Sequence, residues 1–227
     1  MRALMLLLTL LLVPGLPVHA QTAPALPGLT EGVQYTAIEG GKPFRQQGPG
    51  KIEVVEVFSY SCPHCAYLQP KLEAWQASLP KSVVVSYMHA AFDPGDPFML
   101  GYLAADAAKA VPLSHHRLFA AVHDTGELPR NATLQQVTSF YLGLPGINGK
   151  AFTAALADKA SLGRTMLATR EFQMRSKLSG TPTLIVDGRY LVNGNSYDSI
   201  LGNTRKIIDA ITASRKLAGK APTKPRS

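Results

Sequence analysis

The stretch that decides the fold is Ile52-Glu-Val-Val-Glu-Val-Phe58, followed directly by Ser59-Tyr-Ser-Cys62-Pro-His-Cys65. Residues 52–58 are β-rich and almost continuously apolar, a pattern typical of a strand that is covered on both faces. After the cysteines, apolar residues recur at helical spacing, and Pro63 suits a first helical turn. These apolar positions are Leu68, Leu72, Trp75 and Leu79. We predict a buried strand, a short turn and a helix that begins at the cysteines.

The segments around this unit indicate an α/β fold. Residues 83–89 are a second β-branched run, so we expect a βαβ unit with parallel strands. From 93 to 163 the apolar period is helical, and we expect three or four short helices. Asp96-Pro97 should open one helix, Ser114 should cap another, and Thr133 with Gln136 forms a capping-box pattern.

The C-terminal part returns to strands. We expect a helix over 162–178, a hairpin over 183–192 around Asp187-Gly188, and a helix over 197–214. Residues 33–38 suit a short edge strand. Because strands flank an all-helical block, we predict a scaffold of residues 21–92 and 164–214 with residues 93–163 inserted.

The N-terminus has the features of a secretory signal. Arg2 precedes an apolar run over 3–13, which is shorter than the ~20 residues of a membrane-spanning helix. Helix-breaking Pro14-Gly15 and then Val18-His19-Ala20 follow, so we expect residues 1–20 to be removed before Gln21. An apolar N-terminal core helix is the alternative interpretation. Export implies an oxidising compartment.

Charge and composition exclude several classes of protein. The 227 residues are 46% hydrophobic and 17% charged, which favours a folded domain over disorder. The net charge of +8 includes five basic residues after position 214. We expect residues 215–227 to form a disordered, solvated tail, and we expect no nucleic-acid partner.

The chain contains two cysteines, Cys62 and Cys65, separated by Pro63 and His64. A structural zinc site needs four ligands, and the haem pattern needs a histidine where Ala66 stands. A disulfide across three residues closes almost no loop, so it stabilises the chain little. Redox chemistry is therefore the favoured interpretation, and we expect no metal and no cofactor.

The predicted position of Cys62 at a helix N-terminus favours its thiolate, because unpaired backbone N–H groups and the helix dipole stabilise negative charge there. Cys65, one turn inside, should be shielded and resolve the mixed disulfide. His64 lies between them, where it would either stabilise the Cys62 thiolate or be an exposed turn histidine. A stabilised thiolate makes the disulfide a strong oxidant.

Two motifs together resemble the DsbA family of periplasmic thiol:disulfide oxidoreductases. The first motif runs from Glu56 to Cys65. The second runs from Gly180 to Tyr190, begins 115 residues after Cys65, and reads Gly-Thr-Pro-Thr-Leu-Ile-Val-Asp-Gly-Arg-Tyr. A very acidic cysteine and a strongly oxidising disulfide characterise this family. The resemblance implies a thioredoxin fold with an inserted all-helical domain. It also implies that the chain donates its disulfide to newly secreted proteins through a mixed disulfide at Cys62.

The resemblance also assigns residues and partners. Pro182 would have a cis peptide bond beside the disulfide, and Thr181 would offer backbone groups to an extended substrate peptide. Glu56 matches the family's acidic residue beneath the active site, where its apolar strand favours a raised pKa and a proton relay toward Cys65. An outward-facing carboxylate is the alternative for Glu56. Reoxidation would come from a DsbB-like, quinone-linked membrane protein, and we expect a monomer.

Two other functions stay open. The first is a disulfide isomerase or reductase, because isomerase-like relatives commonly have a threonine at the position of Thr181. The family's isomerases, however, carry an N-terminal dimerisation domain. Residues 21–51 are too few to form such a domain. A non-catalytic Cu(I)-binding protein that uses both cysteines and a histidine such as His64 or His89 is the other. The histidines of the helical block should be solvated or partly packed. They are His115, His116 and His123.

Overall fold

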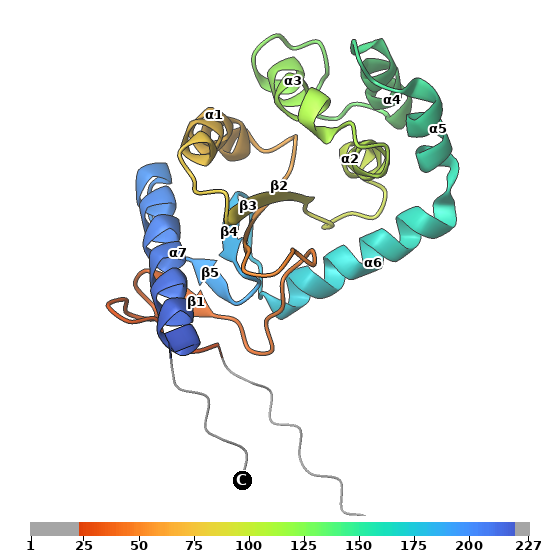
Figure 1. Ribbon diagram of the computed structural model, residues 1–227. Helices are drawn as coiled ribbons and strands as arrows, with labels where there is room; N and C mark the ends of the chain where they lie inside the picture. The colour runs from red at the N-terminus through yellow and green to blue at the C-terminus, as the bar shows by residue number, and fades with distance from the viewer. Residues whose placement is uncertain (1–22, 221–227) are drawn as a thin grey trace, which may run out of the picture.

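The computed structural model describes residues 23–220, in which five strands form one mixed sheet (Figure 1). The strand order is β1-β5-β4-β2-β3; β2 pairs parallel with β3, and the other neighbours pair antiparallel. The βαβ unit, the hairpin and the short edge strand are confirmed. The strands are β1 (Tyr35–Ala37), β2 (Ile52–Phe58), β3 (Val83–His89), β4 (Thr183–Val186) and β5 (Tyr190–Val192).

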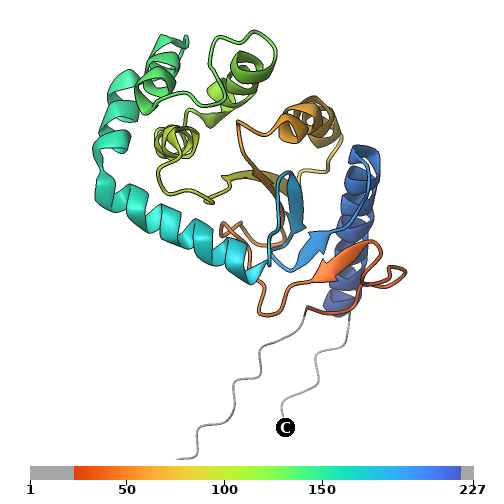
Figure 2. The same cartoon turned by 180° about the vertical axis from the view of Figure 1, so that it is seen from behind.

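Strand β2 is buried along its whole length because helices cover both faces of the sheet. Val54 packs on one side with residues of α1 (Pro63–Ala77) and α7 (Tyr197–Lys220). Val55 and Val57 pack on the other side with Phe172 of α6 (Lys159–Arg175). Figures 1 and 2 show α1 and α7 on one side of the sheet and α6 on the other. Successive strand residues point to opposite faces, so a strand between two helical layers must be apolar throughout.

A block of four helices lies between β3 and α6 and packs around a core of its own beside the end of β2 (Figure 1). Asp96 caps the first helix of the block, and Thr133 with Gln136 forms the expected capping box. The prediction for Ser114 was wrong. Ser114 lies inside its helix and donates to the Ala110 carbonyl at 3.0 Å, since the proline after Val111 starts the helix earlier. The helices are α2 (Pro97–Ala107), α3 (Val111–His123), α4 (Leu134–Gly143) and α5 (Gly149–Ala157).

Helix α7 extends further than we expected. We predicted that it would end at 214 and that 215–227 would be disordered, but the helix continues to Lys220. Arg215 explains the extension, because its guanidinium donates to Asp187 at 2.8 Å and to the Lys51 carbonyl at 3.0 Å. The remaining tail positions and the expected signal peptide, 1–20, lie outside the described residues. No helix within 23–220 combines the length and apolarity needed to cross a bilayer.

Candidate active site

The two cysteines lie where β2 ends and α1 begins, as the sequence indicated. Cys62 is the N-cap residue of α1, with extended backbone angles, and Pro63 occupies the first turn. The Cys62 N–H donates to the Ser59 carbonyl at 3.1 Å, which closes a tight turn over 59–62. The turn after a strand buried on both faces therefore places Cys62 at the positive end of a helix, where an anion is stabilised.

The environment of Cys62 favours its thiolate. A hydrogen bond from the Cys65 thiol, helped by the backbone N–H groups of Cys65 and His64, lowers the pKa of Cys62 to about 5, against the opposing effect of partial burial. The first turn of α1 carries no acidic side chain that would oppose the negative charge. Cys62 is half-buried, so the sulfur stays accessible to a reactant.

Cys65 has the opposite character. It is fully buried, and its hydrogen bond to Cys62 together with burial raises the pKa of its thiol. Both cysteines are free thiols in this structure. One accessible acidic thiol beside one buried weakly acidic thiol is the asymmetry that a nucleophile and a resolving partner require.

The loop before β4 adjoins the cysteines from the far end of the sequence. The Thr181–Pro182 peptide bond is cis, as the resemblance implied. In its protonated form the Cys62 thiol donates to the Thr181 carbonyl at 3.4 Å. The Thr183 hydroxyl closes the loop by donating to the Gly180 carbonyl at 2.8 Å. The antiparallel pairing of β2 with β4 brings this loop beside the start of α1.

Strand β2 carries two buried glutamates with contrasting surroundings. Glu53 accepts hydrogen bonds from the backbone N–H groups of Phe44 and Arg45 and from the Ser86 hydroxyl. Glu56, three residues on, is fully buried, and neither carboxylate oxygen has a hydrogen-bond partner among the described residues. Burial raises the pKa of Glu56 to about 8, with smaller contributions from Cys62 and Glu73.

This contrast identifies Glu56 as a protonated group near neutral pH. It lies on the same face of β2 as Val54, the face that α1 covers, and its charge would raise the pKa of Cys65. The alternative of an outward-facing carboxylate is wrong, because the side chain is 0% exposed. A neutral acid next to a buried thiol can give up one proton and recover it.

Sequence reasoning missed the partner of His64. The exposed imidazole of His64 bonds through Nδ1 to the hydroxyl of Tyr197, at 3.2 Å. Tyr197 begins α7, 133 residues further along the chain, so no local pattern could reveal this contact. The contribution of His64 to the Cys62 thiolate comes from its backbone N–H.

The histidines of the helical block differ from one another. His116 is exposed and contacts Glu73 at 3.3 Å, and His123 is half-buried, as expected. The expectation was wrong for His115, which is 4% exposed and bonds to the Tyr60 hydroxyl. Within residues 23–220, no three His, Cys, Asp or Glu side chains are grouped so as to hold a metal ion.

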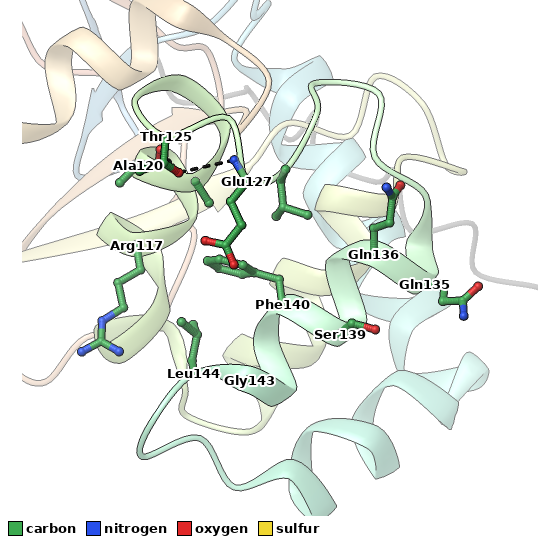
Figure 3. A pocket seen from close by; sticks show the side chains of 12 residues that line it. Arg117, Ala120, Thr125, Glu127, Gln135, Gln136, Ser139, Phe140, Gly143 and Leu144 are labelled. Carbon is green, nitrogen blue, oxygen red and sulfur yellow. Dashed lines mark hydrogen bonds between the residues drawn. The ribbon is translucent and has the colours of Figure 1, made fainter.

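A surface hollow of about 640 Å³ lies on the helical block, between α3 and α4 (Figure 3). Arg117, Glu127 and Phe140 are among its lining residues, and both cysteines lie outside it. The hollow is therefore separate from the redox site.

Comparisons with known proteins agree with this geometry. Residues 49–210 match the family model Thioredoxin_4, described as "Thioredoxin". The thiol:disulfide interchange protein DsbA of Azotobacter vinelandii is 32% identical over 162 residues, which are 70% of this chain and 72% of the relative. DsbA of Bordetella parapertussis is 30% identical over 189 residues, 81% and 85% of the two chains. The crystal structure of oxidoreductase DsbA from Xylella fastidiosa is similar with a TM-score of 0.72 and 35% identity, covering 85% of this chain and 100% of that one.

Proposed function

Because this chain belongs to the DsbA family of thiol:disulfide interchange proteins, we propose that Cys62 and Cys65 donate their disulfide to newly secreted proteins. The chain is a thiol:disulfide oxidoreductase with a thioredoxin fold. The observation that carries the direction of reaction is the position of Cys62 at the N-terminus of α1, which stabilises its thiolate. Stabilising the thiolate stabilises the reduced protein, so the oxidised protein gives its disulfide away.

The exchange has two steps. A substrate thiolate attacks the Cys62 sulfur, the Cys62–Cys65 bond breaks, and Cys65 leaves as a thiolate that takes up one proton. A second substrate thiolate then attacks the substrate sulfur of the mixed disulfide and expels the Cys62 thiolate. The substrate has lost two electrons, the protein has gained two, and the low pKa of Cys62 makes it a good leaving group.

We assign the remaining site residues by their places in this exchange. Glu56 supplies the proton to the Cys65 thiolate and recovers it during reoxidation, since it is a buried neutral acid close to Cys65. Pro63 starts the helix, and the backbone N–H of His64 supports the thiolate. Thr181 and Pro182 form the wall beside Cys62 that an extended substrate peptide would pair with.

The cellular setting and partners are also proposals. The apolar segment over 3–13 supports export to the periplasm, where secreted proteins arrive reduced. A DsbB-like, quinone-linked membrane protein would reoxidise the cysteine pair, and the protein would act as a monomer. We divide the chain into a thioredoxin domain of 21–92 and 164–214 and an inserted helical domain of 93–163.

A transfer assay tests the direction of reaction. We expect the oxidised protein, mixed with an equal amount of a reduced two-cysteine peptide, to become reduced while the peptide gains a disulfide. Alkylation of free thiols followed by mass spectrometry measures both chains, and the pre-reduced protein is the matched control. Retention of the disulfide on the protein would contradict the oxidase and favour a reductase. An isomerase would instead act only on a peptide with mispaired disulfides.

A further inference from the structure

Tyr60 is held by three histidines, one at each of its polar groups. Its backbone N–H donates to His89 Nε2 at 3.3 Å, and its carbonyl accepts from His123 Nε2 at 2.7 Å. Its hydroxyl bonds to His115 Nδ1 at 2.8 Å. Tyr60 is 0% exposed and lies two residues before Cys62. The exchange described above uses none of these histidines.

Two of the three contacts come from the helical block. His89 ends β3 in the sheet, whereas His115 and His123 both belong to α3. They are eight residues apart, slightly more than two helical turns, so both can face the same neighbour. Helix α3 therefore reaches across to the turn at two points, and it also packs beside α1.

The contact with His123 fixes one peptide group of the turn. The Cys62 N–H to Ser59 carbonyl bond spans the turn, and the Tyr60 carbonyl lies inside that span. A buried carbonyl needs a donor, and the Nε2–H of His123 is the donor present. Rotation of this peptide group would break the bond, so His123 restrains the backbone that leads into Cys62.

The aromatic packing restrains the Tyr60 side chain as well. The His115 ring lies 4.7 Å from the Phe58 ring and 4.2 Å from the Tyr87 ring, measured between centroids. Burial lowers the pKa of His115 to about 3, so the ring is neutral. It forms one hydrogen bond with the Tyr60 hydroxyl. Strand residue Phe58, the turn and α3 are thereby packed as one unit.

We propose that His123 and His115 are positioning residues for thiol–disulfide exchange, through which helix α3 fixes the turn that carries Cys62. The inference rests on the proposed function, because it concerns the same cysteine pair. The N–H groups of His64 and Cys65 hydrogen-bond to the Cys62 sulfur, and a shift of the turn would move that sulfur away from them. The helical block thus helps to set the redox equilibrium and does more than enclose the site.

Three substitutions at His123 separate positioning from general stability. His123→Gln keeps an N–H donor close to the position of Nε2, whereas His123→Asn is too short to reach the carbonyl and His123→Leu has no donor. Val137→Ala is the control, since Val137 is buried in the same block on α4 and makes no hydrogen bond to the turn. The equilibrium of the Cys62–Cys65 pair with glutathione and the Cys62 titration are measured for each, beside the melting temperature.

We expect His123→Asn and His123→Leu to move the glutathione equilibrium about tenfold toward the oxidised protein, which corresponds to a rise of about one unit in the pKa of Cys62. His123→Gln should recover most of this shift. Val137→Ala should lower the melting temperature and leave the equilibrium where it was. His115→Leu should act in the same direction as His123→Leu.

Two results would overturn the proposal. One is an unchanged equilibrium in both His123→Asn and His123→Leu, and the other is an equal shift in Val137→Ala, which would assign the effect to stability alone. If His123→Leu does not fold, the difference in glutathione equilibrium between His123→Asn and His123→Gln still tests whether the donor at this position matters. A wild-type protein that exchanges with neither glutathione nor a dithiol peptide would instead contradict the proposed function.

Discussion

Cys65→Ala is expected to accumulate mixed disulfides with secreted proteins through Cys62, whereas Cys62→Ala is expected to accumulate almost none. In Cys65→Ala the accessible thiol of Cys62 remains at the N-terminus of α1, without the hydrogen bond from the Cys65 thiol, and the intramolecular thiol that releases a trapped substrate is gone. In Cys62→Ala the remaining thiol is buried and its pKa is raised, so it is a poor nucleophile. Both variants should lose essentially all disulfide transfer.

Non-reducing gels of cell extracts, alkylated at the moment of lysis, measure the adducts. The double variant Cys62→Ala with Cys65→Ala gives the background. Adducts of equal intensity in both single variants would contradict the roles assigned to the two cysteines. The same gels, run on wild-type protein from cells that lack the proposed DsbB-like partner, should show the Cys62–Cys65 pair reduced. A pair that stays oxidised there would remove the proposed recycling route.

The second large effect concerns Glu56. Burial raises the pKa of Glu56 from 4.5 to about 8, so the folded state holds a proton that the unfolded state releases above about pH 4.5. The stability that this proton contributes is complete below pH 4.5 and is lost as the pH rises through 8. Wild-type stability should therefore fall by about 3 kcal/mol between pH 4.5 and pH 7 through this one group.

Glu56→Gln cannot ionise, so its free energy of unfolding should not show this fall, and its stability relative to wild type should rise with pH. Any constant cost of burying the amide cancels when the two pH profiles are compared. Urea unfolding across this pH range measures the effect. Glu53→Gln is the matched control, because Glu53 accepts hydrogen bonds from four donor groups, which an amide cannot all keep. We expect that variant to be less stable than wild type throughout.

Parallel pH profiles for wild type and Glu56→Gln would show that Glu56 does not carry a raised pKa in the folded protein. A proton-relay role would then lose its basis. The relay itself predicts a separate kinetic effect, a slower release of Cys65 in Glu56→Gln when the oxidised protein reacts with a thiol. Equal rates in wild type and variant would leave Glu56 without a part in the exchange.

The sequence predicted the elements that local patterns encode. Residues 52–58 are apolar on both faces, which indicated a strand between two helical layers, and β2 is such a strand. The Cys-Pro-His-Cys segment opens α1 because Pro63 suits a first turn. The predictions of a low pKa for Cys62 and a raised pKa for Glu56 followed from these placements, and the hydrogen bonds to Cys62 and the burial of Glu56 favour the same directions.

Other features depend on which segments the fold brings together. The contact between Thr181 and Cys62 joins residues 119 apart, and only the family resemblance indicated it. Tyr197 lies 133 residues from its partner His64, and His115 lies 55 residues from its partner Tyr60, so helical spacing gave no sign of either contact. Helix α7 extends past 214 because a distant carboxylate, Asp187, pairs with Arg215. A tail rich in positive charge indicates disorder unless such a partner is known.

The most direct test of the central claim is the titration of the Cys62 thiol in the reduced protein. Ultraviolet absorbance of the thiolate, followed against pH and corrected with Cys62→Ala, gives the pKa of this one group. The structure predicts a midpoint at about 5. A midpoint near the ~8.5 of an unperturbed cysteine would contradict a helix-stabilised thiolate and, with it, the oxidising direction of the exchange.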